Sequence, residues 1–271
     1  MSDFFHSFNA VRGIQAGRPC YIAMCPMRII PKIFVFDEDE VPAELRAQRK
    51  LNKGRIPEMT NYLIENPRNY TLSSLTASID GETEFTPMSE SSSNIGTLKI
   101  SMDAQILLND GQHRRAAIEE AVNNNTKLGH DHISVVFFLD NGLKRSQQMF
   151  SDLNRYAVKP SGSLNILYDH RDQTRNHVFN IIEQVPVFQE NVDFEKTSIS
   201  NRSTKLFTLS SVYKANKTLL ANFQTVDQEI INKVIIFWEE TTLAMNPWQD
   251  FLEGKKPYKL REETIAVNDL A

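Results

Sequence analysis

Residues 106–118, ILLNDGQHRRAAI, bring an acidic turn, an imidazole and two adjacent guanidinium groups together in one short stretch. The apolar run at 106–108 is short and unbroken, which is typical of a buried strand. Apolar residues then recur at helical spacing, which predicts a helix from about Gly111 to about Asn124. The residues that could carry chemistry therefore lie between the end of a strand and the first turn of a helix.

The charges around this helix start have two interpretations. Asp110 is expected to be the N-cap, because its carboxylate can accept hydrogen bonds from the first-turn amides. Two arginines near the positive end of a helix dipole cost roughly 0.3–1 kcal/mol each, and a bound anion would offset that cost. The alternative is a capped helix whose arginines face water. The first interpretation predicts an anion- or nucleotide-binding site made of Asp110, Gly111, Gln112, His113, Arg114 and Arg115.

Composition excludes some classes of function. The 271 residues suffice for one large domain or two small ones, and no apolar run reaches the length of a membrane span. Cys20 and Cys25 have neither zinc-knuckle nor thioredoxin spacing, which indicates inert thiols in a reducing compartment. His130 and His132 lack a third ligand nearby, so no metal site is predicted. The N-terminus has no signal-peptide pattern, and we expect a cytoplasmic protein.

The basic residues are unevenly distributed along a chain whose net charge is −4. A basic cluster directly follows the acidic run at 37–40, and the segment 196–226 holds five basic residues and no acid. Such segregation can produce a basic face on an acidic protein, although solvated helix surfaces would look the same. The predicted DNA-binding residues are Arg46, Arg49, Lys50, Lys53, Arg55, Arg202, Lys205, Lys214 and Lys217.

The order of elements predicts a mixed α+β domain followed by a mainly helical region. We place the domains at 1–160 and 161–271, with a linker near Lys159–Gly162, and the charged C-terminus is expected to continue in a longer protein. The polar stretch 89–96 is expected to be a surface loop. Strands are predicted over 20–26, 28–36, 70–80, 84–88, 97–102 and 132–140, and helices over 55–65, 141–157, 172–184, 209–221 and 226–245.

Four segments resemble the DndB-like family of DNA sulfur modification proteins, which carry a DGQHR domain. They are DGQHRRAAI and residues 46–80, 135–172 and 208–220, within a similarity that extends from about Tyr21 to about Leu220. The resemblance implies a ParB/sulfiredoxin-like mixed-sheet domain. It also implies a role in bacterial DNA phosphorothioation, where DndB-like proteins are DNA-binding regulators that repress the modification genes.

The same resemblance bears on the DGQHR turn. Sulfiredoxin and ParB-like proteins hold nucleotide phosphates on a comparable turn, and by similarity Gly111, His113 and Arg114 occupy those positions, with Asp110 shaping the turn. Gln112 stands where sulfiredoxin has its catalytic cysteine. A sulfinic-acid reductase is therefore not expected, because the thiolate nucleophile is missing.

Two classes of function stay open at this point. In the first, the protein is a repressor that binds the promoter of the modification genes, as a homodimer if the operator is palindromic, and it contacts other proteins of the DNA sulfur modification system. In the second, it is a ParB-like NTP-hydrolysing or DNA-nicking enzyme that uses ATP with Mg²⁺. The candidate catalytic carboxylates are then Asp110, Asp152 and Asp169, none of which lies in a recognisable metal motif.

Overall fold

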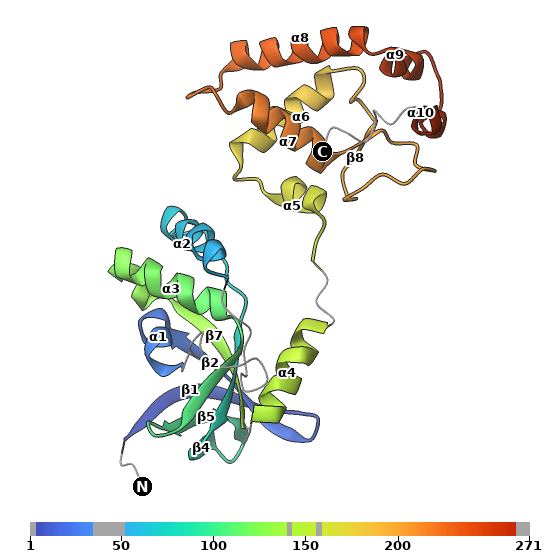
Figure 1. Cartoon of the computed structure of the whole chain (residues 1–271). Helices are drawn as coiled ribbons and strands as arrows, with labels where there is room; N and C mark the ends of the chain where they lie inside the picture. Colours follow the sequence, from blue (N-terminus) through green and yellow to red (C-terminus); the bar gives the residue numbers. More distant parts are fainter. Residues whose placement is uncertain (1–3, 35–51, 140–142, 156–158, 264–271) are drawn as a thin grey trace. The chain divides into compact units, whose positions relative to one another are not determined.

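The computed structural model describes residues 4–34, 52–139, 143–155 and 159–263. The chain divides into two compact units, Met1–Ala157 and Val158–Ala271 (Figure 1). Strands and helices mix in the first unit, and helices dominate the second, which confirms the α+β class. Among the described residues, no helix is both long enough and apolar enough to span a membrane.

The first unit is built around a seven-stranded sheet with the order β4-β5-β1-β2-β7-β3-β6. The pair β3–β7 is parallel and the other pairs are antiparallel. The strands are β1 Phe5–Gln15, β2 Arg18–Pro26, β3 Leu75–Asp80, β4 Thr83–Ser89, β5 Ser92–Ser101, β6 Gln105–Asp110 and β7 His132–Leu139.

Helices lie on both faces of this sheet. On one face, Leu63 of α2 and Ile118 of α3 join the core formed with Phe137 of β7. On the other face, α4 packs on β3 and β6. Ser78 of β3 faces away from that core, and its hydroxyl lies 3.9 Å from the sulfur of Met149 in α4. Asn109 of β6 donates a hydrogen bond to the Ser146 carbonyl of α4. The helices of this unit are α1 Ile30–Ile33, α2 Ile56–Glu65, α3 Gln112–Asn124 and α4 Leu143–Arg155, with short 3-10 helices η1 Met27–Ile29, η3 Lys53–Arg55 and η4 Thr126–His130.

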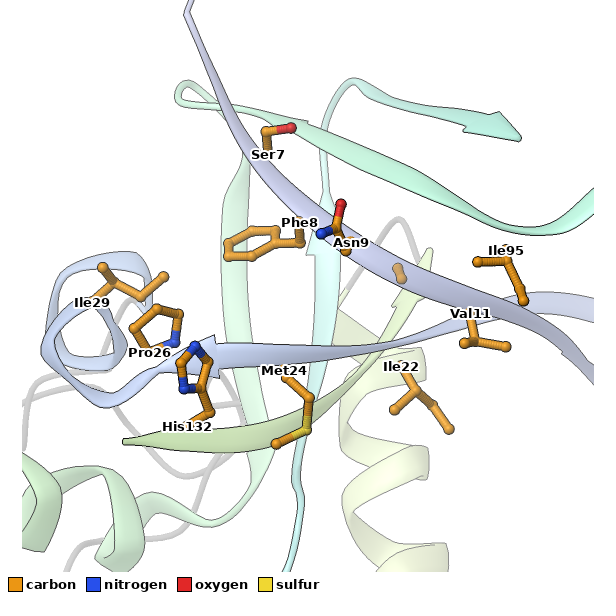
Figure 2. Close-up of a pocket in the computed structure, with 11 residues that line it drawn as sticks. Ser7, Phe8, Asn9, Val11, Ile22, Met24, Pro26, Ile29, Ile95 and His132 are labelled. Carbon is orange, nitrogen blue, oxygen red and sulfur yellow. The ribbon is translucent and has the colours of Figure 1, made fainter. Parts of the chain in front are cut away.

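The face of the sheet that carries α4 also exposes apolar side chains. Val11 of β1 stands opposite Ile95 of β5 and Ile22 of β2, and Ile22 stands opposite Val136 of β7. This row of β-branched side chains crosses four strands, and Val11 and Ile22 are 47% and 49% exposed. Together with Met24 they line an open groove of about 660 Å³ (Figure 2).

The second unit has an aromatic core. Phe188 packs edge-on against Trp238 and Trp248, whose indole rings stack on each other. The elements are α5 Gly162–Tyr168, α6 Gln173–Gln184, α7 Leu209–Leu220, α8 Gln228–Ala244, α9 Asn246–Leu252, α10 Pro257–Glu263 and the two-residue strands β8 Val192–Asp193 and β9 Phe207–Thr208. The three helices predicted over 172–184, 209–221 and 226–245 are confirmed as α6, α7 and α8.

Some predicted elements were wrong. The first part of 28–36 is helical rather than extended, because Pro31 occupies the first turn of α1 and the buried Ile30 and Ile33 lie on one helical face. The expected loop 89–96 is a tight hairpin, in which Ser89 pairs with Ser92. The linker predicted near 159–162 is not among these, because its residues 159–161 precede α5, which begins at Gly162 and is capped by Ser161.

We expect Asn216→Ala to destabilise the second unit by about 1–3 kcal/mol. Asn216 is fully buried, accepts a 2.9 Å hydrogen bond from the Trp238 indole and donates to the Val212 carbonyl. Both tryptophans lie in this unit, so urea unfolding followed by tryptophan fluorescence measures it selectively. The control Asn232→Ala removes an exposed amide of α8 and should change stability by less than about 0.5 kcal/mol. Equal effects of the two variants would contradict this account.

Candidate functional site

The junction between β6 and α3 is built on a left-handed glycine. Gly111 has a φ of 106°, and a Cβ at this position would lie 2.3 Å from the Cδ2 of Leu75. Glycine is therefore required both by the backbone conformation and by the available space. Gly111 is also the N-cap residue of α3, so the prediction that Asp110 caps this helix was wrong. The Asp110 carboxylate instead forms an ion pair with Arg114, one helical turn further on.

Arg114 ties the helix start to the segment that precedes β3. Its guanidinium donates to the Asp110 carboxylate, to the Ser73 hydroxyl and to the Ser74 carbonyl, the last at 2.8 Å. The side chain is 14% exposed. Three acceptors on two segments therefore fix this arginine, and it holds the DGQHR turn in shape.

Gln112 and Arg115 also bond within the fold. Gln112 is buried, and its amide donates to the carbonyls of Leu108 and Asn109 at the end of β6. Arg115 donates to the Glu119 carboxylate at 2.8 Å and to the Pro31 carbonyl at 2.9 Å. Both side chains therefore stabilise the structure next to the turn.

The residue before the turn attaches α4 to the sheet. Asn109 is fully buried, and its side-chain oxygen accepts a 2.8 Å hydrogen bond from the Ser78 hydroxyl. Its amide donates to the backbone carbonyl of Ser146 at 3.3 Å. This pair of bonds places α4 directly beside the DGQHR turn.

A pocket of about 170 Å³ lies where these elements meet. It brings together the first turns of α2 and α3 and the C-terminal half of α4. Five of the six predicted anion-site residues line it, and Arg115 is not among the lining residues. The lining residues are Arg55, Met59, Asp110, Gly111, Gln112, His113, Arg114, Phe150 and Asn154.

Three of these lining residues were not predicted as site residues. Met59 comes from α2, and Phe150 and Asn154 come from α4. The sequence does show which of these residues are neighbours. Arg55 and Met59 are four residues apart, as are Phe150 and Asn154, and residues at this spacing share one face of a helix. Nothing in the sequence says that these two faces meet at the DGQHR turn.

The polar side chains of the pocket differ in how they are held. Nε2 of His113 accepts a 3.2 Å hydrogen bond from the backbone amide of Asn52, which puts the proton of the neutral ring on Nδ1. Arg55 is exposed. The side-chain amide of Asn154 donates to the Phe150 carbonyl at 2.8 Å, and its side-chain oxygen is a hydrogen-bond acceptor that α4 contributes to the pocket.

The predicted DNA-binding residues lie in both units. Lys53 and Arg55 are exposed in the first unit, whereas Arg46, Arg49 and Lys50 lie outside the described residues. In the second unit Lys205 donates to the Glu190 carbonyl, and Lys217 lies 5.7 Å from the ring centre of Tyr213. Of the DNA-binding residues predicted in that unit, Arg202, Lys214 and Lys217 are exposed.

The three candidate catalytic carboxylates have different surroundings. Asp110 is held by Arg114, Asp152 is exposed and accepts a 2.7 Å bond from Gln148, and Asp169 belongs to the second unit. No cluster of three or more His, Cys, Asp or Glu side chains suited to a metal ion occurs within the described ranges.

Comparison with known proteins places the chain in a family. The family described as "DndB: DNA-sulfur modification-associated" matches residues 8–271. The chain therefore belongs to the DndB family, as its motifs predict. No curated protein matches it. A solved structure of the C-terminally truncated chromosome-partitioning protein ParB from Caulobacter crescentus, complexed with CTP-gamma-S, is similar at 10% identity and a TM-score of 0.35, covering 89% of this chain and 97% of that one. Similarity at this level supports no argument about the chain.

We expect Arg114→Ala to loosen the first unit, since it removes a charge-assisted network worth about 1.5–3 kcal/mol. Hydrogen exchange measured by mass spectrometry should speed up over residues 105–124. The matched control is Arg55→Ala, because Arg55 lies in the same pocket but is exposed. It should leave exchange unchanged. Unchanged exchange in Arg114→Ala would mean that the arginine does not hold the turn.

The two cysteines should react very differently in the native protein. Burial raises the pKa of the Cys25 thiol to about 12, so at pH 8 almost none of it is thiolate. Cys20 is partly exposed on the same strand. Iodoacetamide at pH 8 should therefore label Cys20 first, and Cys25 only after unfolding. Equal labelling rates in native protein, read by peptide mass spectrometry, would contradict this prediction.

Proposed function

We propose that this DndB-family protein is a DNA-binding regulator that represses the genes of a bacterial phosphorothioate-modification cluster. We also propose that the pocket at the DGQHR turn takes a phosphate of the DNA backbone. One observation carries the proposal, namely the convergence of Arg55 with the glycine turn and first helical turn of α3 in a single pocket. Family membership supplies the link to DNA sulfur modification.

The charge of the pocket favours an anion. The one carboxylate among its lining residues, that of Asp110, is compensated by Arg114. Arg55 then adds a further positive charge. The backbone amides of the first turn of α3 point toward the N-terminal end of this helix, where the pocket lies. A phosphate diester bears a single negative charge, which matches this balance.

The size of the pocket favours a DNA phosphate over a free nucleotide. Small-molecule sites usually enclose roughly 300–1,000 Å³, whereas this pocket has about 170 Å³. A nucleoside triphosphate would extend well beyond it, while one backbone phosphate would fill much of it. This comparison supports the regulator over an ATP- and Mg²⁺-dependent enzyme.

Footprinting of the protein on the promoter of the modification genes tests the proposal directly. A regulator should protect a defined site and shift the promoter fragment at protein concentrations that leave unrelated DNA free. Phosphate release from ATP, measured with and without DNA, is run in parallel. Turnover without promoter protection would replace the regulator with the enzyme alternative.

A second test is a variant in which four basic residues become Gln, namely Arg202, Lys205, Lys214 and Lys217. It should bind the promoter more weakly, and its affinity should depend less on salt concentration. Each lost phosphate contact changes the slope of log affinity against log salt by roughly 0.9, so the slope should fall by up to about 3–4. The control replaces four other lysines of the same unit, Lys233, Lys255, Lys256 and Lys259, and changes the net charge equally. Equal slopes in both variants would exclude the segment 196–226 as a DNA contact and favour Lys53 and Arg55.

A further inference from the structure

The pocket at the DGQHR turn has two chemically different kinds of wall. Arg55, His113 and Asn154 provide polar groups, whereas Met59 and Phe150 provide a thioether and an aromatic ring. Met59 and Phe150 are both partly buried, so these apolar groups belong to the pocket rather than to open surface. A ligand that fits the whole pocket must therefore offer both an anionic side and an apolar, polarisable side.

An ordinary phosphate binds to the polar walls of the pocket but gains nothing from its apolar walls. Its two non-bridging oxygens are both strong hydrogen-bond acceptors. An oxygen turned toward the thioether and the ring would lose its water without gaining a donor, which is unfavourable. A phosphorothioate replaces one of these oxygens with sulfur, which is larger, softer and a weaker acceptor. Sulfur makes favourable contacts with aromatic rings and with other polarisable groups.

We propose that this pocket prefers a phosphorothioate linkage over an unmodified one, with sulfur against Met59 and Phe150 and oxygen toward Arg55 and His113. This inference rests on the proposed function, in which the pocket takes a backbone phosphate of DNA. Because the two kinds of wall are fixed, one of the two phosphorothioate diastereomers places sulfur correctly and the other does not. A repressor with this preference binds modified DNA, which is what the enzymes encoded by its target genes produce.

An enrichment experiment on the promoter fragment tests the preference. The fragment is synthesised with one phosphorothioate per molecule at varied positions and in both diastereomers. Free and bound DNA are separated on a gel and cleaved with iodine, which cuts at phosphorothioates. Bound DNA should be enriched about two- to tenfold at one or a few linkages, as expected for sulfur contacts of ordinary strength. Duplexes with the pure diastereomers at those linkages should then differ in affinity.

Two variants tie the preference to the pocket. Met59→Gln puts an amide donor where the thioether lies, so the ratio of bound to free phosphorothioate should fall to one at every linkage. Arg55→Gln should weaken binding of modified and unmodified DNA alike and keep the enrichment. The control Met102→Gln changes an exposed methionine that does not line this pocket, and it should behave as wild type.

The outcomes separate the two proposals. Promoter binding by the wild type with phosphorothioates evenly distributed between bound and free DNA would overturn the sulfur preference and leave the regulator intact. Enrichment that survives Met59→Gln in a folded protein would place the sulfur contact elsewhere and overturn the assignment to this pocket. Absence of binding to any promoter duplex would overturn both proposals.

Discussion

The arrangement of the site depends on the guanidinium of Arg114. This side chain reaches Asp110 at the end of β6 and Ser73 and Ser74 before β3, so it joins two segments at the left-handed Gly111. The same charge compensates Asp110, which would otherwise repel an anion. One arginine therefore fixes the geometry of the turn and sets the sign of the charge beside it. Arg55 lines the same pocket and is exposed to a ligand.

The sheet supplies the frame on which this turn is mounted. Helices α2 and α3 pack on one face, and α4 packs on the other, attached through the buried Asn109. The pocket lies beside the end of β6, where helices from both faces approach the turn. Its mixture of cationic and apolar walls follows from this position. Arg55 and His113 come from the starts of α2 and α3, and Asn154 comes from the end of α4. Met59 and Phe150 extend from the sides of α2 and α4.

The sequence indicated the motif, its strand and its helix, because short buried strands and amphipathic helices have strong local patterns. It did not indicate how the motif's charges are used, since Arg114 could face an anion or an acceptor within the fold with the same spacing. Met59 and Phe150 escaped notice for a different reason, because their neighbours lie far away in sequence. The strand predicted over 28–36 is helical at residues 28–33, because alternation and helical spacing overlap in short apolar runs. The predicted contacts of Arg46, Arg49 and Lys50 lie outside the described residues.

The most direct test of the central claim, that the DGQHR pocket takes a DNA phosphate, is an NMR titration with a short promoter duplex. The protein carries ¹⁵N in its backbone and ¹³C in its methionine methyl groups. The account predicts that the amides of Gly111 and His113 and the methyl group of Met59 shift together with the saturation of binding. Saturated binding that leaves these three signals unmoved would contradict it.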